Sequence, residues 1–227
     1  EELSQGQSLM GILSNYATDS LVTASCRIAF RYLSRQKDQG REIAERMALA
    51  SQFAQADSYR AATHNKGIFN GIDAVLIATG NDWRAIEAGA HAFASREGHY
   101  QGLSQWTLDV EREELVGEMT LPMPVATKGG SIGLNPRVAL SHELLGNPSA
   151  KELAQLIVSI GLAQNFAALK ALVSTGIQQG HMKLQAKSLA LLAGASESEV
   201  APLVEQLIAD KTFNLETAQR YLENLRL

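Results

Sequence analysis

The chain has 227 residues, with 24 acidic and 20 basic side chains and a formal net charge of −4. Its content of 45% hydrophobic and 19% charged residues is typical of globular proteins, which excludes a disordered or collagen-like chain. The slightly acidic balance gives no electrostatic basis for binding nucleic acid or an anionic membrane, and the single cysteine, Cys26, excludes an internal disulfide and favours the reducing cytoplasm.

The first thirty residues predict two short strands. Leu9–Leu13 and Leu21–Phe30 are rich in residues that favour strands, and the polar segment Ser14–Ser20 between them is typical of a turn. The chain opens at Glu1 without a basic and then apolar leader, so we expect no signal peptide and a processed or truncated piece. No apolar run approaches the roughly 20 residues that span a bilayer, so no membrane segment is expected.

Helical periodicity follows. A first helix is predicted from Glu42 to about Ala56, and a second, starting near Asn65, ends before Thr79-Gly80, where glycine suits the residue after a helix. Asn81-Asp82 then occupies an N-cap position ahead of a strongly helical run, Trp83–Arg96.

The segment Trp106–Leu121 alternates apolar and polar residues around Glu111–Glu114, which predicts a β-hairpin with a solvated turn. Pro122–Pro136 predicts a loop. The remaining chain predicts helices over Ala150–Val173, His181–Ala193, Glu197–Ala209 and Leu215–Leu225, with a capping box at Ser196 and Glu199. The sequence therefore predicts a mixed α/β (α+β) body that is rich in helix and a small C-terminal helical domain behind a glycine-flanked hinge.

Lys66 is the first candidate for chemistry. If the second helix starts near Asn65, then Lys66, Asn70 and Asp73 share one stripe, and Asp82 is a candidate partner for the ammonium group. The alternative is ordinary: lysines near helix starts are usually solvated, and an aspartate before a helix is usually only its cap.

His181 is the second candidate, because it opens a helix after a polar, glycine-flanked segment. Its alternative is a surface histidine near a hinge. The other four histidines share no metal-ligand spacing, so no metal site is expected, and Cys26 is predicted to be an inert core residue. The phosphate-binding and nucleophile-elbow motifs G-x-G-x-x-G, G-x-x-x-x-G-K-[ST] and G-x-S-x-G are absent.

Several segments nevertheless form a recognisable series. In chain order they are Gly11–Asn15, Arg60–Asp73, Ala78–His91, Gly161–Asn165 and Gly176–Met182. Together they resemble the class II, bacterial type of 3-hydroxy-3-methylglutaryl-coenzyme A reductase, over essentially the whole chain. This family reduces a thioester to an alcohol, or runs the reverse reaction, with two equivalents of NAD(H) or NADP(H) and with coenzyme A as product or substrate.

The resemblance implies roles for three catalytic residues. Lys66 would hydrogen-bond the carbonyl oxygen on which charge develops, and Asp82 would couple to that lysine. His181 would protonate the departing coenzyme A thiolate, carried by a tail that closes over the substrate.

The resemblance also implies binding residues. Arg60 would pair with the terminal carboxylate of the substrate, and Asn70, Gln164 and Asn165 would add neutral hydrogen bonds. Asn15 would lie near the nicotinamide. The implied partners are HMG-CoA and mevalonate and a second copy of the chain, in a homodimer with an interfacial active site that could assemble further.

Two family motifs are missing here, the one that carries the catalytic glutamate and one that contacts the cofactor. We therefore expect the chain to be a C-terminal portion that is inactive alone. Residues 1–15 would end the cofactor-binding small domain, 16–175 would form the second part of the substrate-binding large domain, and 176–227 would form the closing domain. The alternative is a non-catalytic module that binds coenzyme A or acyl groups or assists assembly. The choice between NADH and NADPH, and the direction of the reaction, stay open.

Overall fold

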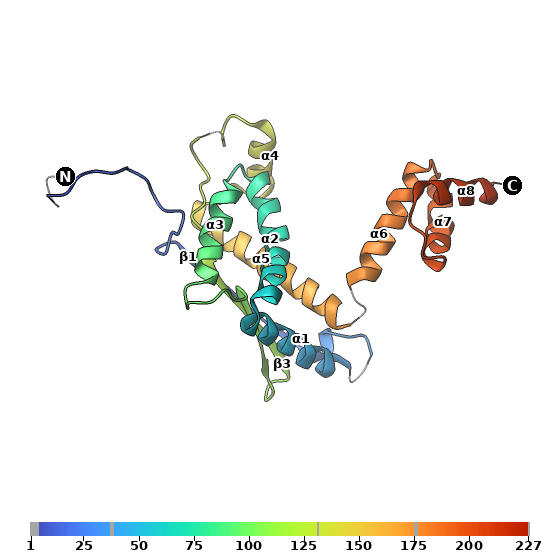
Figure 1. Ribbon diagram of the computed structural model, residues 1–227, viewed down its shortest axis with the longest axis horizontal. Coiled ribbons are helices and arrows are strands. Elements are labelled where there is room, and N and C mark those ends of the chain that lie inside the picture. The colour runs from blue at the N-terminus through green and yellow to red at the C-terminus, as the bar shows by residue number, and fades with distance from the viewer. Residues whose placement is uncertain (1–4, 37–38, 131, 175–176, 227) are drawn as a thin grey trace. The chain divides into compact units, whose positions relative to one another are not determined.

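The computed structural model describes residues 5–36, 39–130, 132–174 and 177–226, and the side chains of residues 177–181 lie outside this description. The chain divides into two compact units, Glu1–Lys170 and Ala171–Leu227 (Figure 1). The first unit combines helices with a three-stranded sheet, and the second is helical. The predicted mixed α/β class, mostly helical, is confirmed.

The sheet of the first unit is antiparallel, with the order β1-β3-β2. Strand β1 spans Leu21–Ala29, β2 spans Ser104–Asp109 and β3 spans Glu114–Pro122. The predicted hairpin is therefore present. Side chains alternate along β2 and β3, so one face of the sheet is covered while the other carries polar pairs such as Arg27–Asp109, 2.9 Å apart.

A close contact between β2 and β3 fixes the covered face. Trp106 lies opposite Gly117 and is 1% exposed. A Cβ atom at Gly117 would lie 2.4 Å from the indole ring, so only glycine allows Trp106 to lie flat against the strand. The Trp106 backbone N–H donates to Ser51 Oγ at 3.0 Å, which ties the sheet to α1.

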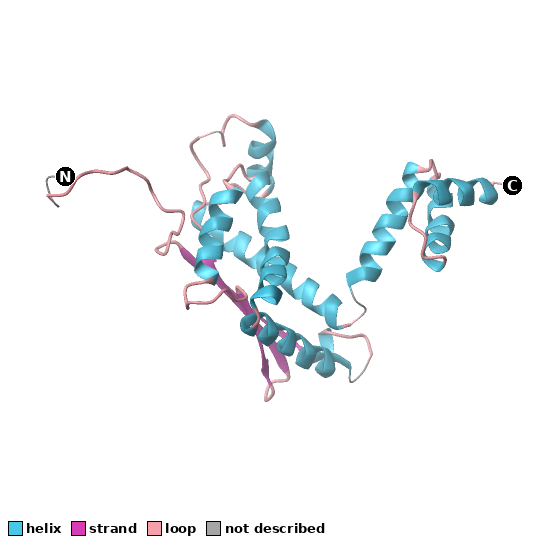
Figure 2. Ribbon diagram, in the orientation of Figure 1, coloured by secondary structure: helices cyan, strands magenta, loops and turns pink. Residues whose placement is uncertain are grey.

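The helices of this unit pack beside the strands (Figure 2). They are α1 (Gln39–Ala56), α2 (Ser58–Ala78), α3 (Trp83–Ala94), α4 (Pro136–Leu144) and α5 (Ala150–Val173). Gly161 of α5 faces Met119 of β3 and Ile72 of α2, and a Cβ atom there would meet both side chains within 2.9 Å. The missing side chain lets α5 approach both elements closely.

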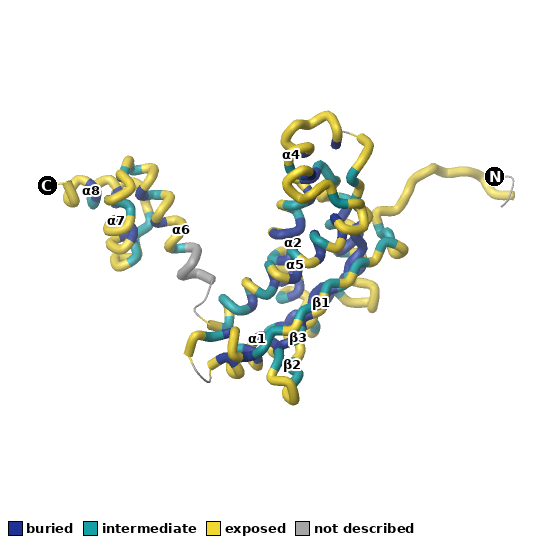
Figure 3. Tube along the Cα trace, turned by 180° about the vertical axis from the view of Figure 1, so that it is seen from behind, coloured by how far each residue is buried: buried dark blue, intermediate teal, exposed yellow. Residues whose placement is uncertain are grey.

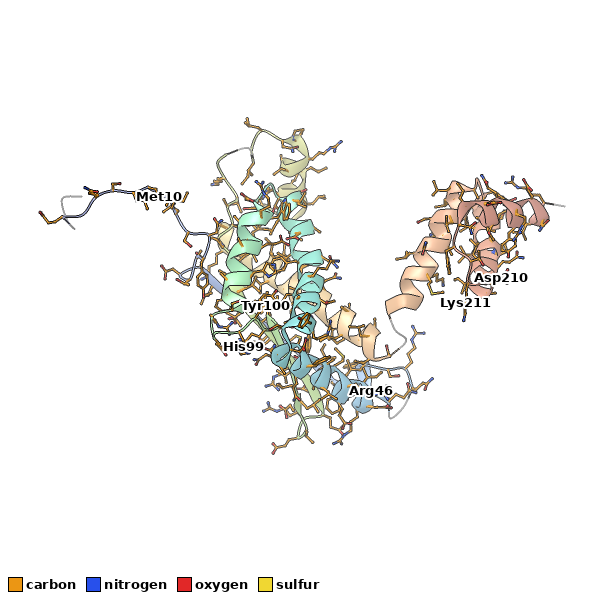
Figure 4. All side chains as sticks on the ribbon, viewed as in Figure 1. Met10, Arg46, His99, Tyr100, Asp210 and Lys211 are labelled. Carbon is orange, nitrogen blue, oxygen red and sulfur yellow. The ribbon has the colours of Figure 1, made fainter. Side chains whose placement is uncertain are left out.

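Two sequence predictions in this unit are wrong. Leu9–Leu13 forms no strand: the segment is extended, with Leu9 88% and Leu13 93% exposed (Figure 3), and Met10 lies on this segment, clear of the helices (Figure 4). A strand needs a neighbour for its backbone hydrogen bonds, and the described chain supplies none to this segment. The predicted loop Pro122–Pro136 ends in a further helix, α4, signalled by the Asn135 cap before Pro136.

Helix α5 also departs from expectation. It is 24 residues long and apolar enough, by length and composition, to cross a membrane, although no such segment was expected. Scattered polar residues such as Gln155 and Gln164 interrupt its apolar runs. Part of it, including Leu153, Ile157 and Leu162, is buried inside the protein.

The second unit has its own core, formed by α6 (Ile177–Leu192), α7 (Glu197–Ala209) and α8 (Leu215–Leu225). The last two helices have the predicted bounds, whereas α6 starts four residues before the predicted His181. The capping box is present, with Ser196 Oγ 2.8 Å from the Glu199 carboxylate. Arg226 and Ser196 hydrogen-bond that carboxylate and lower the pKa of Glu199 to about 2.

Candidate active site

Helix α2 carries most of the predicted site residues of the first unit. It starts at Ser58, seven residues before the predicted start, because the Asp57 side chain accepts from the Arg60 backbone N–H at 2.7 Å and caps it. One side of the helix is buried. The opposite side exposes Lys66 and Asn70, so the stripe predicted from their spacing faces outward.

Two cations on α2, Arg60 and Lys66, have no ion-pair partner in the part of the chain that the structure describes. Among the described residues, no carboxylate lies within ion-pair distance of Arg60 or Lys66. Arg60 is half-buried, and this burial lowers the pKa of its guanidinium. Because a partly desolvated cation is stabilised by a nearby anion, α2 offers a site for an anionic group.

The two binding residues on α5 have different surroundings. Gln164 is half-buried and packs against α2, since a Cβ atom at Gly71 would lie 3.1 Å from the Gln164 Cβ. This places Gln164 against Gly71, which follows Asn70 in the chain. Asn165 is 2% exposed and faces inward, where its Oδ1 atom accepts from Trp106 Nε1 at 2.7 Å and from Ser104 Oγ at 2.8 Å. Its predicted contact with substrate stays a prediction.

Asp82 caps α3. Its Oδ1 atom accepts from the backbone N–H groups of Arg84 and Ala85 at 3.1 and 3.2 Å, and its carboxylate is exposed. The structure does not bring it to Lys66 within one chain. Twelve residues of continuous helix separate Lys66 from Ala78, which at 1.5 Å per residue is about 18 Å before the chain turns toward Asp82.

The remaining two predicted residues belong to other parts of the chain than α2. The side chain of His181 is outside the described residues, and its backbone belongs to α6 of the second unit. Asn15 is exposed, and its backbone oxygen lies where a Cβ atom of Gly89 would be, 2.4 Å away. The glycine therefore lets the Asn15 segment pack directly on α3.

Lys66 and Asn70 are exposed side chains of α2. Four cavities in the described residues, of about 660, 500, 270 and 130 Å³, all have linings that lack Arg60, Lys66 and Asn70. Among the described residues, no group of three or more histidine, cysteine or acidic side chains is arranged to hold a metal ion. Burial raises the pKa of the half-buried Cys26 thiol, so it stays protonated at neutral pH.

Asp73 takes part in a carboxyl pair that the sequence analysis did not identify. Burial, and then the charge and hydrogen bond of Glu87 on α3, raise the pKa of Asp73 to about 6. The two positions are 14 residues apart and on different helices, so only the packing of α2 on α3 reveals the pair. Asp73 therefore keeps its proton up to about pH 6, because two ionised carboxylates side by side repel each other.

This pair predicts a pH-dependent stability. Because the folded pKa of Asp73 lies above its ordinary value of 3.8, the fold binds the proton more tightly than the unfolded chain. The contribution to the free energy of unfolding is therefore full below about pH 4 and lost as the pH rises through about 6. We expect Asp73→Asn to flatten this decline, measured by urea unfolding from pH 4 to 8. Exposed Glu97→Gln serves as the control, and an unchanged slope in Asp73→Asn would refute the assignment.

Comparison with known proteins gives consistent matches. The family model for hydroxymethylglutaryl-coenzyme A reductase matches residues 1–186. A 3-hydroxy-3-methylglutaryl-coenzyme A reductase of Archaeoglobus fulgidus is 44% identical over 226 residues, which is 100% of this chain and 50% of that protein. A probable reductase of the same kind from Borreliella burgdorferi is 37% identical over 224 residues, 96% of this chain and 51% of that protein.

Solved structures agree. A 3-hydroxy-3-methylglutaryl-coenzyme A reductase from Streptococcus pneumoniae is 94% identical, with a TM-score of 0.76. The match covers 99% of this chain and 53% of that reductase. A class II 3-hydroxy-3-methylglutaryl-CoA reductase from the same organism, bound to NADPH in open conformations, is 93% identical, with a TM-score of 0.75. The match covers 100% of this chain and 55% of that reductase. The chain thus spans about half the length of the relatives it matches.

Proposed function

Because the chain belongs to the hydroxymethylglutaryl-coenzyme A reductase family, in its class II, we propose that it supplies part of the active site of an enzyme that interconverts HMG-CoA with mevalonate and coenzyme A. The observation that carries this proposal is the pair of cations on one helix, Arg60 and Lys66, which have no ion-pair partner among the described residues and stand beside exposed Asn70. HMG-CoA combines a carboxylate with a thioester carbonyl, and each needs a positive group.

Lys66 would act on the carbonyl oxygen. As hydride reaches the thioester carbon, negative charge grows on that oxygen, and an ammonium hydrogen bond stabilises it more than it stabilises the neutral carbonyl. Arg60 would hold the terminal carboxylate. Asn70 and Gln164 would add neutral hydrogen bonds beside it, whereas Asn165 would have to exchange some of its interior partners to do so.

The helix geometry supports a site shared by two copies. Since Asp82 lies beyond the far end of α2 from Lys66, the pairing proposed for these residues would join Lys66 of one copy to Asp82 of another. A two-fold axis would create two such sites, because an isologous interface repeats each contact in both directions. The homodimer is thus part of the proposal, and higher assembly is left open.

His181 is proposed to protonate the coenzyme A thiolate when the carbon–sulfur bond breaks, since imidazole can deliver a proton near neutral pH. We expect His181→Gln to impair thioester reduction at least about 10-fold more than reduction of free mevaldehyde, which has no thiolate to protonate. Parallel kinetics with both substrates check this. Equal losses on the two substrates would contradict the role.

The cofactor proposal is NADPH, because a class II relative binds it. Each NADPH that binds would supply one hydride, so the two reduction steps would use two equivalents in succession. Exposed Asn15 is the one described residue that we assign near the nicotinamide. In domain terms, we propose that residues 1–15 end a cofactor-binding domain, 16–175 belong to the substrate domain and 176–227 form a closing domain. A cytoplasmic location is proposed from the single cysteine and from relatives in bacteria and an archaeon.

A non-catalytic coenzyme A-binding or assembly module is the alternative. The two readings differ when the 227-residue chain is assayed with HMG-CoA and NADPH, first alone and then with the other half of a class II reductase. We expect no turnover from the chain alone and NADPH oxidation from the reconstituted pair. Absence of turnover from a pair shown by gel filtration to have assembled would favour the non-catalytic module.

A further inference from the structure

A buried polar cluster lies on the side of α2 opposite Lys66. It consists of His64 on α2, Ser104 and Trp106 on β2 and Asn165 on α5, all at most 2% exposed. His64 Nε2 lies 2.7 Å from Ser104 Oγ and 3.2 Å from Asn165 Nδ2. Three elements that meet in the core are therefore joined by hydrogen bonds through one histidine.

Trp106 fixes the orientation of the Asn165 amide in the cluster. The Trp106 indole N–H can only donate, so Asn165 must present its oxygen to it and its Nδ2 group to His64. Ser104 donates its one hydroxyl proton to Asn165 Oδ1, so His64 Nε2 either donates to Ser104 Oγ or accepts from Asn165 Nδ2, with the ring proton on Nε2 in the first case and on Nδ1 in the second. His64 Nδ1 is buried without a hydrogen-bond partner among the described residues.

This arrangement costs free energy, since a buried polar atom without a partner destabilises the fold. Burial, and then the nearby Arg60 charge, lower the pKa of His64 to about 4, so the ring stays neutral at physiological pH. An apolar ring of similar size would fill the same space but would leave the buried Asn165 Nδ2 group without its partner. The hydrogen bonds of the histidine therefore contribute something that packing alone does not.

Directional hydrogen bonds can fix the rotation of a helix about its own axis. Residues advance by about 100° per position around a helix, so Lys66 points about 160° away from His64. Apolar contacts of α2 tolerate small rotations and shifts, whereas hydrogen bonds of fixed length and direction do not. Asn65 also restrains the orientation of α2. Its Nδ2 donates to Gln101 O at 2.9 Å, and its Oδ1 accepts from Leu103 N at 2.8 Å.

We propose that His64 is a positioning residue whose hydrogen bonds to Asn165 and Ser104 set the rotation of α2 and thereby the direction in which Lys66 projects. The inference rests on the proposed function, because it gives the direction of Lys66 a catalytic consequence. Neighbouring residues 64 and 65 thus anchor the helix from inside, and residue 66 acts on the outside.

The test compares two replacements in a full-length class II reductase that contains this sequence. His64→Phe keeps a ring but removes both nitrogens, and His64→Gln keeps an acceptor that Asn165 and Ser104 can reach. Because misplacement of a catalytic group by about 1 Å costs up to about 100-fold, we expect kcat to fall about 10- to 100-fold in His64→Phe, with KM for HMG-CoA within about three-fold. His64→Gln should keep at least about a third of kcat.

Ser58→Ala is the matched control, because Ser58 Oγ donates to Tyr100 O at 3.0 Å from the same helix but outside the cluster. It should leave kcat unchanged. If His64→Phe fails to fold, Ser104→Ala removes one hydroxyl group of the cluster and should lower kcat about two- to five-fold. Fluorescence of Trp106 in a Trp83→Phe background reports whether each change reaches the cluster.

Wild-type kcat in a folded His64→Phe or, failing that, Ser104→Ala enzyme would overturn the inference. So would equal losses in the Phe and Gln variants, since the ring rather than its hydrogen bonds would then matter. Failure of the proposed function has a different signature, namely full activity in Lys66→Ala.

Discussion

Replacing Lys66 with alanine in a full-length class II reductase that contains this sequence is expected to lower kcat about 1,000-fold or more for both HMG-CoA and mevaldehyde. Removing a single donor to a developing oxyanion costs about 100- to 1,000-fold, and an ammonium group carries a full charge in addition. The kcat for both substrates should fall, because each reduction step places negative charge on a carbonyl oxygen. The measurement is initial-rate NADPH oxidation at saturating substrate.

The fold should tolerate this change. Lys66 is exposed on α2 and forms no ion pair within the described residues, and alanine favours the helix. The thermal midpoint should therefore stay within a few degrees of the parent protein. Lys128→Ala, which removes an exposed lysine from the loop before α4, is the control and should keep full activity. Substantial turnover by Lys66→Ala would exclude the proposed role.

Asp82→Asn is expected to lower kcat at least about 100-fold while leaving the fold intact. Asparagine caps a helix about as well as aspartate, so the bonds to Arg84 and Ala85 survive and stability changes little. The amide, however, carries no charge to hold the lysine ammonium in place. The same kinetic assay, combined with a thermal melt, separates the two effects.

A structural role alone for Asp82 gives the opposite pattern. If the aspartate only caps α3, then Asp82→Asn keeps activity and Asp82→Ala loses about 1 kcal/mol of stability. The pair of replacements therefore distinguishes a charge that acts in chemistry from one that only ends a helix.

Local signals predicted much of the helical structure. Helices α5, α7 and α8 have the predicted bounds, because caps and periodicity mark their ends in the sequence itself. The hairpin was equally visible, since alternation and an acidic turn identify it without knowledge of its neighbours. The start of α2 was missed because polar residues mask the periodicity in Ser58–Asn65, and two of them, His64 and Asn65, are buried.

Features that depend on distant parts of the chain could not be predicted. Leu9–Leu13 has the composition of a strand, but a strand exists only with a partner, which local composition does not report. His64 was given no role because a buried histidine is identified by Ser104 and Asn165, which are 40 and 101 positions away.

For the site, the sequence predicted the exposed stripe that holds Lys66 and Asn70 but not its relation to Asp82. Lys66 and Asp82 are only 16 positions apart in the sequence, which suggests that they are neighbours in space. Most of this stretch, however, belongs to the continuous helix α2, which separates the two residues along its axis. Only the observed length of α2 shows that one chain does not join these two groups by itself.

Mixing two inactive variants tests this shared site directly. Subunits that carry Lys66→Ala are dissociated and reassembled with an equal amount of subunits that carry Asp82→Asn. Half of the resulting dimers would be mixed, and each would hold one site with both native residues, so about one quarter of wild-type activity should return. Activity no higher than that of the two parents, in a sample shown to contain mixed dimers, would contradict the pairing of Lys66 with Asp82 across two copies.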